Sequence, residues 1–136
     1  MSKSIAKRST RSKRSAVPDE IARAVEAAAD KKALDIVVLD LREAAGFTDF
    51  FMICTGGNAR QIRAIADAVE AALGVRGSKP VHVEGYRNSE WILLDYFDFV
   101  VHVFSESMRA FYGLERLWGS ASHLDLSRLL PEGSRG

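Results

Sequence analysis

The sequence predicts an α/β (α+β) protein built on a single mixed β-sheet covered by helices. Stretches with helical periodicity alternate with short stretches rich in β-branched and aromatic residues, as is typical of a sheet with helices packed on it. The 136 residues fit one domain, and 47% of them are apolar. A chain of this length buries roughly two-thirds of its unfolded surface, so it can build one hydrophobic core.

Two helices and two strands are expected in the N-terminal half. Residues 18–32 begin with a proline and two acids, which suit the first turn of a helix and oppose the positive end of its dipole. Residues 35–41 and 50–55 are almost continuously apolar, which predicts well-covered strands. Asn58 is the expected N-cap of the longest helix, which keeps apolar residues at helical spacing as far as Gly74.

Three strands and one helix are expected in the C-terminal half. The strands are residues 81–84, 91–95 and 98–104, and Ser105 is the expected cap of a last helix that reaches Trp118. Ordinary amphipathicity would turn three of its side chains toward the core, namely Phe111, Leu114 and Trp118. The expected order is therefore α-β-β-α-β-β-β-α, and the sequence does not determine the order of strands in the sheet.

Charge divides the chain into a basic tail (residues 1–17), a domain (residues 18–119) and a C-terminal tail (residues 120–136). The first 17 residues carry six basic side chains and no acid, whereas the rest has 13 basic against 18 acidic residues, a net charge of −5. We expect the basic tail to be disordered, because it has too little apolar surface to offset its ordering entropy. An RNA tether would use Lys7, Arg8, Arg11, Lys13 and Arg14. A solubilising extension is the alternative, and an organelle transit peptide is disfavoured.

Composition favours a cytoplasmic protein without a metal or cofactor. The single cysteine, Cys54, cannot form an intramolecular disulfide and provides no zinc-type spacing. No apolar run approaches the roughly 20 residues that a membrane helix needs, and the N-terminus lacks the apolar middle of a signal peptide. Cys54 lies among apolar neighbours, so inert burial is expected.

Several short motifs follow one another between residues 35 and 118. They are Asp35-Ile36-Val37-Val38-Leu39-Asp40, Thr48-Asp49-Phe50-Phe51, Ile53-Cys54-Thr55-Gly56, Arg60-Gln61, Ile65-Ala66-Asp67, Val83-Glu84-Gly85, Trp91-Ile92-Leu93-Leu94-Asp95, Val101-His102-Val103-Phe104 and Leu117-Trp118. In this order they resemble the ribosomal silencing factor (Iojap-like) family. Two departures are Phe97, where the family often has glycine, and Gly113, which interrupts the last helix at a cost of about 1 kcal/mol.

The resemblance implies a nucleotidyltransferase-like fold that works without catalysis. Members of the family bind a basic protein of the large ribosomal subunit, the fourteenth of that subunit's series, on the inter-subunit face. The bound factor sterically blocks joining of the small subunit and lowers translation when nutrients are scarce. Some members self-associate, so a homodimer is an additional expectation for the free protein.

Two surfaces are expected to bind the partner. The first is an acidic and aromatic segment that comprises Glu84, Tyr86, Trp91, Asp95, Tyr96, Phe97 and Asp98. Tryptophan and tyrosine are over-represented among interface hot spots, and acidic residues suit a basic partner. The second is one face of the last helix, where Arg109, Tyr112 and Glu115 recur at intervals of three. The alternative is that Trp91 and part of this helix only build the core.

A nucleotide-binding or nucleotidyltransferase-like enzyme is the first alternative function. Residues 55–58 form a glycine-rich turn before a helix, which could bind phosphate. Such enzymes also need paired carboxylates for Mg²⁺, and only Glu84 follows on the next strand. His82 and His102 alternate with apolar residues, so a structural role is expected for both, and no catalytic residue is assigned. An RNA-binding module that depends on the basic tail is the second alternative.

Overall fold

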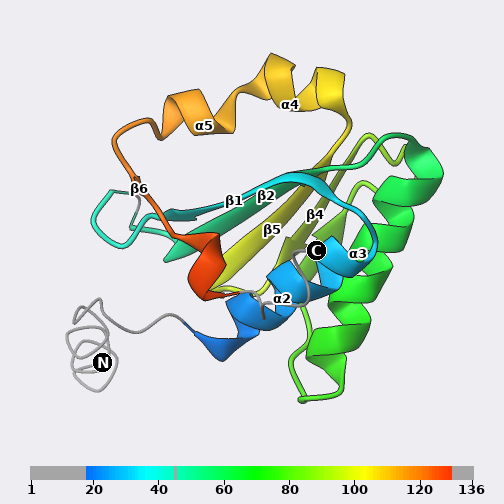
Figure 1. Ribbon diagram of the computed structural model, residues 1–136, viewed down its shortest axis with the longest axis horizontal. Coiled ribbons are helices and arrows are strands. Elements are labelled where there is room, and N and C mark those ends of the chain that lie inside the picture. Colours follow the sequence, from blue (N-terminus) through cyan, green and yellow to red (C-terminus); the bar gives the residue numbers. More distant parts are fainter. Residues whose placement is uncertain (1–17, 45, 130–136) are drawn as a thin grey trace.

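The computed structural model describes residues 18–44 and 46–129, which form three layers (Figure 1). The helices are α2 (Asp19–Asp30), α3 (Ala59–Gly74), α4 (Glu106–Tyr112) and α5 (Leu114–Leu117), and a short 3-10 helix, η1 (Leu126–Arg128), follows later. The strands are β1 (Leu34–Asp40), β2 (Phe50–Thr55), β3 (His82–Glu84), β4 (Trp91–Asp95), β5 (Phe99–Phe104) and β6 (Ser122–His123). One mixed sheet with helices on both faces confirms the predicted α+β fold. The basic tail, with its expected RNA tether, lies outside the described residues.

The sheet has the order β3-β4-β5-β2-β1-β6. Its two central strands, β2 and β5, run parallel with Phe50 beside Phe99 and Thr55 beside Phe104. All the other pairs in the described sheet are antiparallel. Every residue of β2 and β5 is buried, which agrees with the continuous apolarity of both segments.

Helices α2 and α3 cover one face of the sheet, called here the α2–α3 side (Figure 1). Each helix turns one apolar stripe toward the sheet, consisting of Ile21, Ala24, Val25 and Ala28 in α2 and of Ile62, Ile65, Ala66, Val69 and Leu73 in α3. Burying one such isoleucine or leucine contributes about 1.5–3 kcal/mol. The buried cluster on this side is the larger of the two in the described residues. Asn58 caps α3 as predicted, because its side chain accepts a hydrogen bond from the backbone N–H of Gln61 (2.9 Å).

Helices α4 and α5 lie on the opposite face, called here the α4–α5 side (Figure 1). They pack partly buried side chains, among them Met108, Leu114 and Trp118, against a smaller cluster in the sheet. No residue within α4 or α5 is fully buried. This side is therefore only thinly covered.

The predicted continuous last helix is wrong, because the chain breaks at Gly113. Gly113 has φ +54°, a left-handed conformation that glycine adopts without a steric penalty and that ends α4 before α5 begins. Leu114 and Trp118 pack on the sheet as expected, but Phe111 is 73% exposed instead of facing the core.

The chain after Gly119 adds to the fold. Strand β6 pairs with β1, with His123 beside Leu39 and Ser122 beside Asp40. Leu124, Leu126 and Leu129 then pack against the core of the α2–α3 side. The described part of the expected C-terminal tail, residues 120–129, thus contains one strand and the 3-10 helix η1.

Candidate functional site

Strand β4 exposes alternate side chains on the α4–α5 side. Ile92 and Leu94 are fully buried on the α2–α3 side, whereas Trp91, Leu93 and Asp95 are only half-buried. Successive side chains of a strand point to opposite faces of its sheet, which accounts for this division. The surface near Trp91 is therefore partly covered by the protein and partly exposed to solvent.

Trp91 is the centre of an aromatic cluster that joins the sheet to α4. Its ring stacks on Phe104, with 4.9 Å between ring centroids, and lies 4.5 Å from the ring of Tyr112. Tyr112 in turn meets Phe111 edge-on at 5.0 Å. Tyr112 is 46% exposed, so the cluster extends from the buried sheet to the surface. Aromatic pairs of this kind contribute about 0.5–1.5 kcal/mol each beyond their buried area.

His102 lies beneath this cluster and is buried. Its Nδ1 accepts a hydrogen bond from Nε1 of Trp91 (3.1 Å), so the neutral ring carries its proton on Nε2. Burial disfavours the charged form and lowers the pKa of His102 to about 3. In the described part of the chain Nε2 has no hydrogen-bond partner. His102 thus has the structural role that was expected, because Nδ1 binds Trp91, but its Nε2 has no partner among the described residues.

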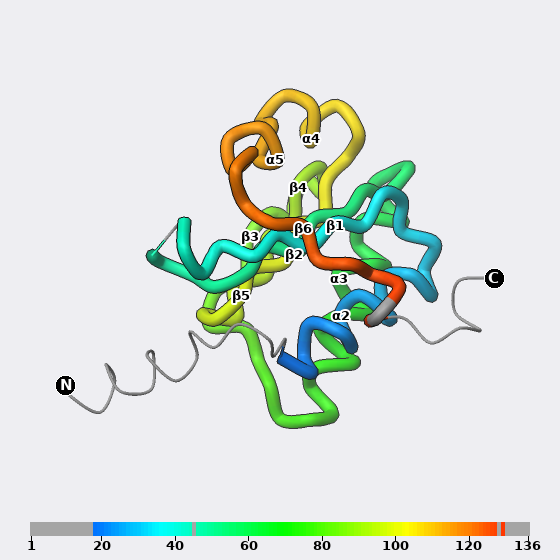
Figure 2. The backbone as a smooth tube through the Cα atoms, turned by 60° about the vertical axis from the view of Figure 1, so that its left-hand side comes forward, coloured from blue at the N-terminus to red at the C-terminus, as the bar shows by residue number. Residues whose placement is uncertain are grey.

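A groove of about 410 Å³ lies beside His102 on the same side of the sheet, and it is called here the sheet groove. Its lining consists of Phe47, Thr48, Phe51, Leu93, Asp95, Phe97, Val100 and His102. Phe47 and Phe97 are 59% and 61% exposed and form its rim. The β1–β2 connection and the β4–β5 turn are joined here by a hydrogen bond, in which the hydroxyl of Thr48 donates to the carbonyl of Phe97 (3.0 Å). Figure 2 traces the backbone of both segments.

Phe97 has a strained backbone in the β4–β5 turn. Its φ is +75°, a left-handed conformation that costs a bulky residue about 1–3 kcal/mol. The conformation is held at both peptide groups: the N–H of Phe97 donates to Oδ1 of Asp95 (2.8 Å), and its carbonyl accepts from Thr48. The turn therefore displays an exposed aromatic ring at a position where glycine would be free of strain.

Arg109 and Glu115 pair with each other across the break at Gly113. Arg109 donates from Nε and from its terminal guanidinium nitrogen to the two carboxylate oxygens of Glu115 (2.9 and 3.1 Å), and also to the hydroxyl of Thr55 (2.8 Å). The hydrogen bonds from Arg109 lower the pKa of Glu115. This pair fixes α4, α5 and the end of β2 relative to one another. The structure thus gives Arg109 and Glu115 an intramolecular role, whereas Tyr112 alone of the three extends the aromatic cluster.

The acidic and aromatic segment of residues 84–98 does not form one surface. Tyr86 packs on the α2–α3 side, where its hydroxyl donates to Asp67 (2.8 Å), and Tyr96 is buried against Phe99 on that same side. Glu84 lies on the edge strand β3 next to Leu93, exposed and paired with the neighbouring histidine. On the α4–α5 side the structure places Trp91 and Tyr112 in the aromatic cluster and Asp95 and Phe97 in the sheet groove, and it separates Tyr86 and Tyr96 from all four.

Sequence reasoning missed Phe47, Thr48 and the unpaired nitrogen of His102. Thr48 and Phe97 are 49 residues apart, and no local pattern shows that their loops meet. The sequence placed His102 in the strand predicted for residues 98–104, but only the register of β4 and β5, with Leu93 beside His102, places it under the groove. Knowing that β4 lies beside β5 would have been enough to place His102 near the exposed residues of β4.

The glycine-rich turn before α3 is occupied by the chain itself. The N–H of Gly57 donates to Oε1 of Gln61 (2.6 Å), and the N–H of Gln61 donates to the side chain of Asn58 (2.9 Å). A Cβ on Gly56 would lie 2.7 Å from Cγ1 of Ile62, so packing requires a glycine there. These contacts support the structural interpretation of the turn and leave little room for phosphate. Cys54 is buried as expected, which raises the pKa of its thiol to about 12.

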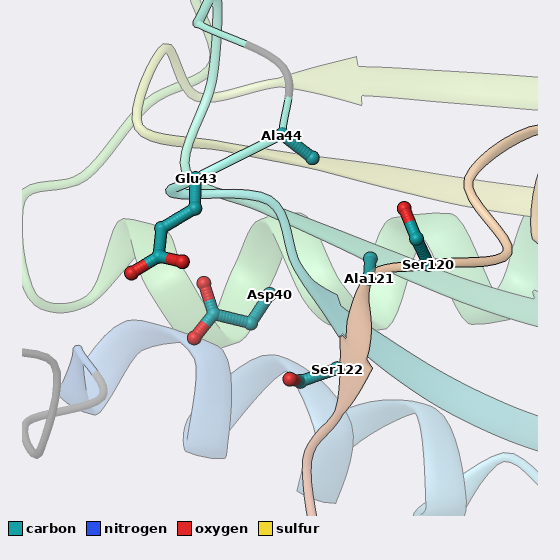
Figure 3. Close-up of a pocket in the computed structure, with 6 residues that line it drawn as sticks. All are labelled: Asp40, Glu43, Ala44, Ser120, Ala121 and Ser122. Atoms are coloured by element: carbon teal, nitrogen blue, oxygen red, sulfur yellow. The ribbon is translucent and has the colours of Figure 1, made fainter.

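A small polar pocket lies at the end of β1, next to the segment that leads into β6 (Figure 3). Asp40 and Glu43 place their carboxylates on the same side of it. Asp40 is bound by Arg42 through two side-chain hydrogen bonds (3.0 and 2.7 Å). Among the described residues no group of three or more histidine, cysteine or acidic side chains could hold a metal ion.

Comparison with known proteins identifies the family. The model of a family described as ribosomal silencing factor during starvation matches residues 14–135. The chain belongs to the ribosomal silencing factor family. The match includes the C-terminal strand and the aromatic cluster, so both lie within the family domain.

Relatives in this family come from bacteria and plant organelles. The chain is 39% identical over 107 residues to the ribosomal silencing factor RsfS of Halalkalibacterium halodurans, covering 79% of this chain and 92% of that one. It is 38% identical over 101 residues to the chloroplastic protein Iojap of maize, covering 74% of this chain and 44% of that one.

Solved structures of similar sequence share the fold. A crystal structure from Chromobacterium violaceum superposes with a TM-score of 0.69 at 37% identity, covering 71% of this chain and 81% of that one. A second, from Bacillus halodurans, gives 0.67 at 38% identity over 75% and 92%. In the part of the chain that the structure describes, no helix is long and apolar enough to cross a bilayer.

Proposed function

We propose that this protein binds the large ribosomal subunit and prevents the small subunit from joining it, without catalysing a reaction. The partner is a basic protein of the large subunit on the inter-subunit face, the fourteenth of its series, and the setting is cytoplasmic translation under nutrient limitation. The observation that carries the proposal is the family match over residues 14–135. Relatives named ribosomal silencing factor agree with it.

The α4–α5 side of the sheet supports this proposal. It presents Trp91 and Tyr112 in a partly exposed aromatic cluster, and Asp95 lies on the same side at the other end of β4. Large aromatic side chains contribute strongly to binding, and rim acids speed the approach of a basic partner. The domain that follows the basic tail has a net charge of −5, which suits such a partner. We therefore assign the contact to this side.

The experiment is co-sedimentation of the full chain with purified large subunits, followed by addition of small subunits. We expect the protein to sediment with large subunits and, at saturation, to reduce the amount of joined ribosomes. Trp91→Ala combined with Tyr112→Ala should raise the Kd at least about tenfold and weaken the block in parallel, because both changes remove hot-spot rings.

The matched control is Tyr86→Ala, which removes an aromatic ring from the α2–α3 side. We expect it to bind within about twofold of the wild type. A wild-type protein that fails to sediment with large subunits, or that leaves subunit joining unchanged at saturation, would overturn the proposed function.

A further inference from the structure

We propose that the sheet groove is a binding pocket for an apolar side chain of the large-subunit partner, and that Phe97 is its specificity-determining wall in this chain. The inference rests on the proposed function and goes further, because it names the chemistry of the segment that the groove receives. The occupant is an extended segment of a basic protein that inserts one apolar side chain and brings a hydrogen-bond acceptor beside it.

The position of Phe97 is the first observation. An aromatic residue occupies a left-handed turn position with φ +75°, where glycine would fit without strain. Its ring gains little from the fold, since it is 61% exposed. Backbone strain of this kind persists where surrounding contacts hold it, and it concentrates at binding sites. Hydrogen bonds from the Phe97 N–H to Asp95 and from Thr48 to the Phe97 carbonyl hold it here.

The shape of the groove is the second observation. Phe97 and Phe47 stand as two exposed rings on its rim, and Leu93, Phe51 and Val100 form an apolar floor between them. Phe51 and Val100 lie beside each other in the parallel β2–β5 pair, so the floor belongs to the rigid centre of the sheet. A volume of about 410 Å³ is enough for a large apolar side chain together with part of its backbone.

His102 provides the third and independent observation. Its Nδ1 is used by Trp91, which leaves the Nε2–H as a donor on the part of the ring turned away from Trp91. His102 is 3% exposed, lines the groove and has no partner for Nε2 among the described residues. A buried donor without an acceptor is costly, and it favours an occupant that supplies one. A peptide carbonyl next to the inserted side chain meets this requirement after a small side-chain rearrangement of the lining.

Charge selects the class of protein that carries this segment. Asp95 lines the groove, and Glu84 lies on the adjacent edge strand on the same side of the sheet. Both carboxylates favour a basic side chain next to the inserted apolar one. The groove also adjoins the cluster of Trp91 and Tyr112 through His102, so one partner can cover both.

The test compares the wild type with Phe97→Gly, which removes the ring and the strain together. We expect Phe97→Gly to have a thermal unfolding midpoint no lower than that of the wild type, because glycine adopts the turn freely. Its Kd for purified large subunits, measured by co-sedimentation at fixed ionic strength, should rise at least about tenfold. Phe97→Tyr keeps the ring and should bind within about twofold of the wild type.

Two further variants keep the test decisive. Phe47→Ala removes the second exposed ring of the groove without changing the strained residue and should also weaken binding at least about fivefold. Val75→Ala, an 83% exposed residue at the end of α3, is the matched control and should bind as the wild type does. Tight binding by the wild type with equally tight binding by Phe97→Gly overturns the groove while leaving the proposed function intact. Absence of wild-type binding overturns both.

Discussion

His102 has two ring nitrogens in different surroundings, and this difference makes it a sensitive reporter of the fold. Nδ1 accepts from the indole of Trp91, and the whole ring is enclosed by Phe51, Phe104 and Trp91. A proton added to Nδ1 would break that hydrogen bond and place a charge in an apolar layer. Burial therefore keeps the ring neutral in the folded protein down to about pH 3.

This neutrality predicts a pH dependence of stability. The pKa of His102 is about 3 in the folded protein and about 6.5 in the unfolded chain, so the unfolded chain binds one more proton between these values. The contribution of His102 to the free energy of unfolding should thus be fully present above pH 6.5. Below pH 6.5 this contribution should fall by about 1.4 kcal/mol per pH unit. Urea denaturation between pH 5 and 7 measures this slope.

His102→Gln is the control, because glutamine does not titrate. It should be less stable than the wild type and lose the part of the slope that belongs to His102. A slope between pH 5 and 6.5 that is unchanged in this variant would show that another group causes it.

At the scale of elements, Arg109 and Glu115 explain how two short helices can stay in place. Neither α4 nor α5 contains a fully buried residue, and isolated helices this short are not stable in water. Packing of Met108, Leu114 and Trp118 on the sheet supplies part of the stabilisation that the helices lack on their own. The contact of Arg109 with Glu115 and Thr55 fixes the orientation of the helices, because it connects α4, α5 and β2.

Replacing Arg109 by alanine should lower the free energy of unfolding by about 1–2 kcal/mol, after allowing for solvent screening of the half-exposed Glu115. The stabilisation comes from a carboxyl whose pKa is lowered, so it is present above the ordinary value near 4.5 and is lost as the pH falls below it. Urea unfolding of Arg109→Ala at pH 7 and at pH 4 measures both effects, with a smaller loss at pH 4. Arg116→Ala, an exposed arginine of the same segment, should change stability by less than about 0.5 kcal/mol.

For the whole molecule, the basic tail and the domain make separable contributions. We expect removal of residues 1–17 to weaken binding to large subunits without abolishing it, because the contact surface lies on the domain. The tail carries six positive charges, so its loss should also make binding less sensitive to salt. Co-sedimentation of the full and shortened chains across a series of KCl concentrations measures the two slopes. Complete loss of binding at low salt would instead assign the contact to the tail.

Much of this molecule could be predicted from sequence, since its elements depend on local patterns. The start of α2 at a proline followed by two acids, the apolar stripe of α3 and the Asn58 cap all follow from local sequence, and all are confirmed. The strand order and the groove could not be predicted, because they depend on contacts between distant residues such as Thr48 and Phe97. The break at Gly113 lies between these cases: the glycine was visible, but its left-handed conformation was not.

The parallel pairing of β2 with β5 has a kinetic consequence. Strands β1 and β2, like β4 and β5, are neighbours in sequence and pair antiparallel, so each pair can form early at small entropic cost. The pairing of β2 with β5, which joins the two halves, forms only after the ends of a long intervening segment come together; this segment contains α3 and β3. Folding of this chain should therefore be limited by the meeting of two preformed hairpin halves, and the groove floor, which straddles their seam, should be among the last parts to assemble.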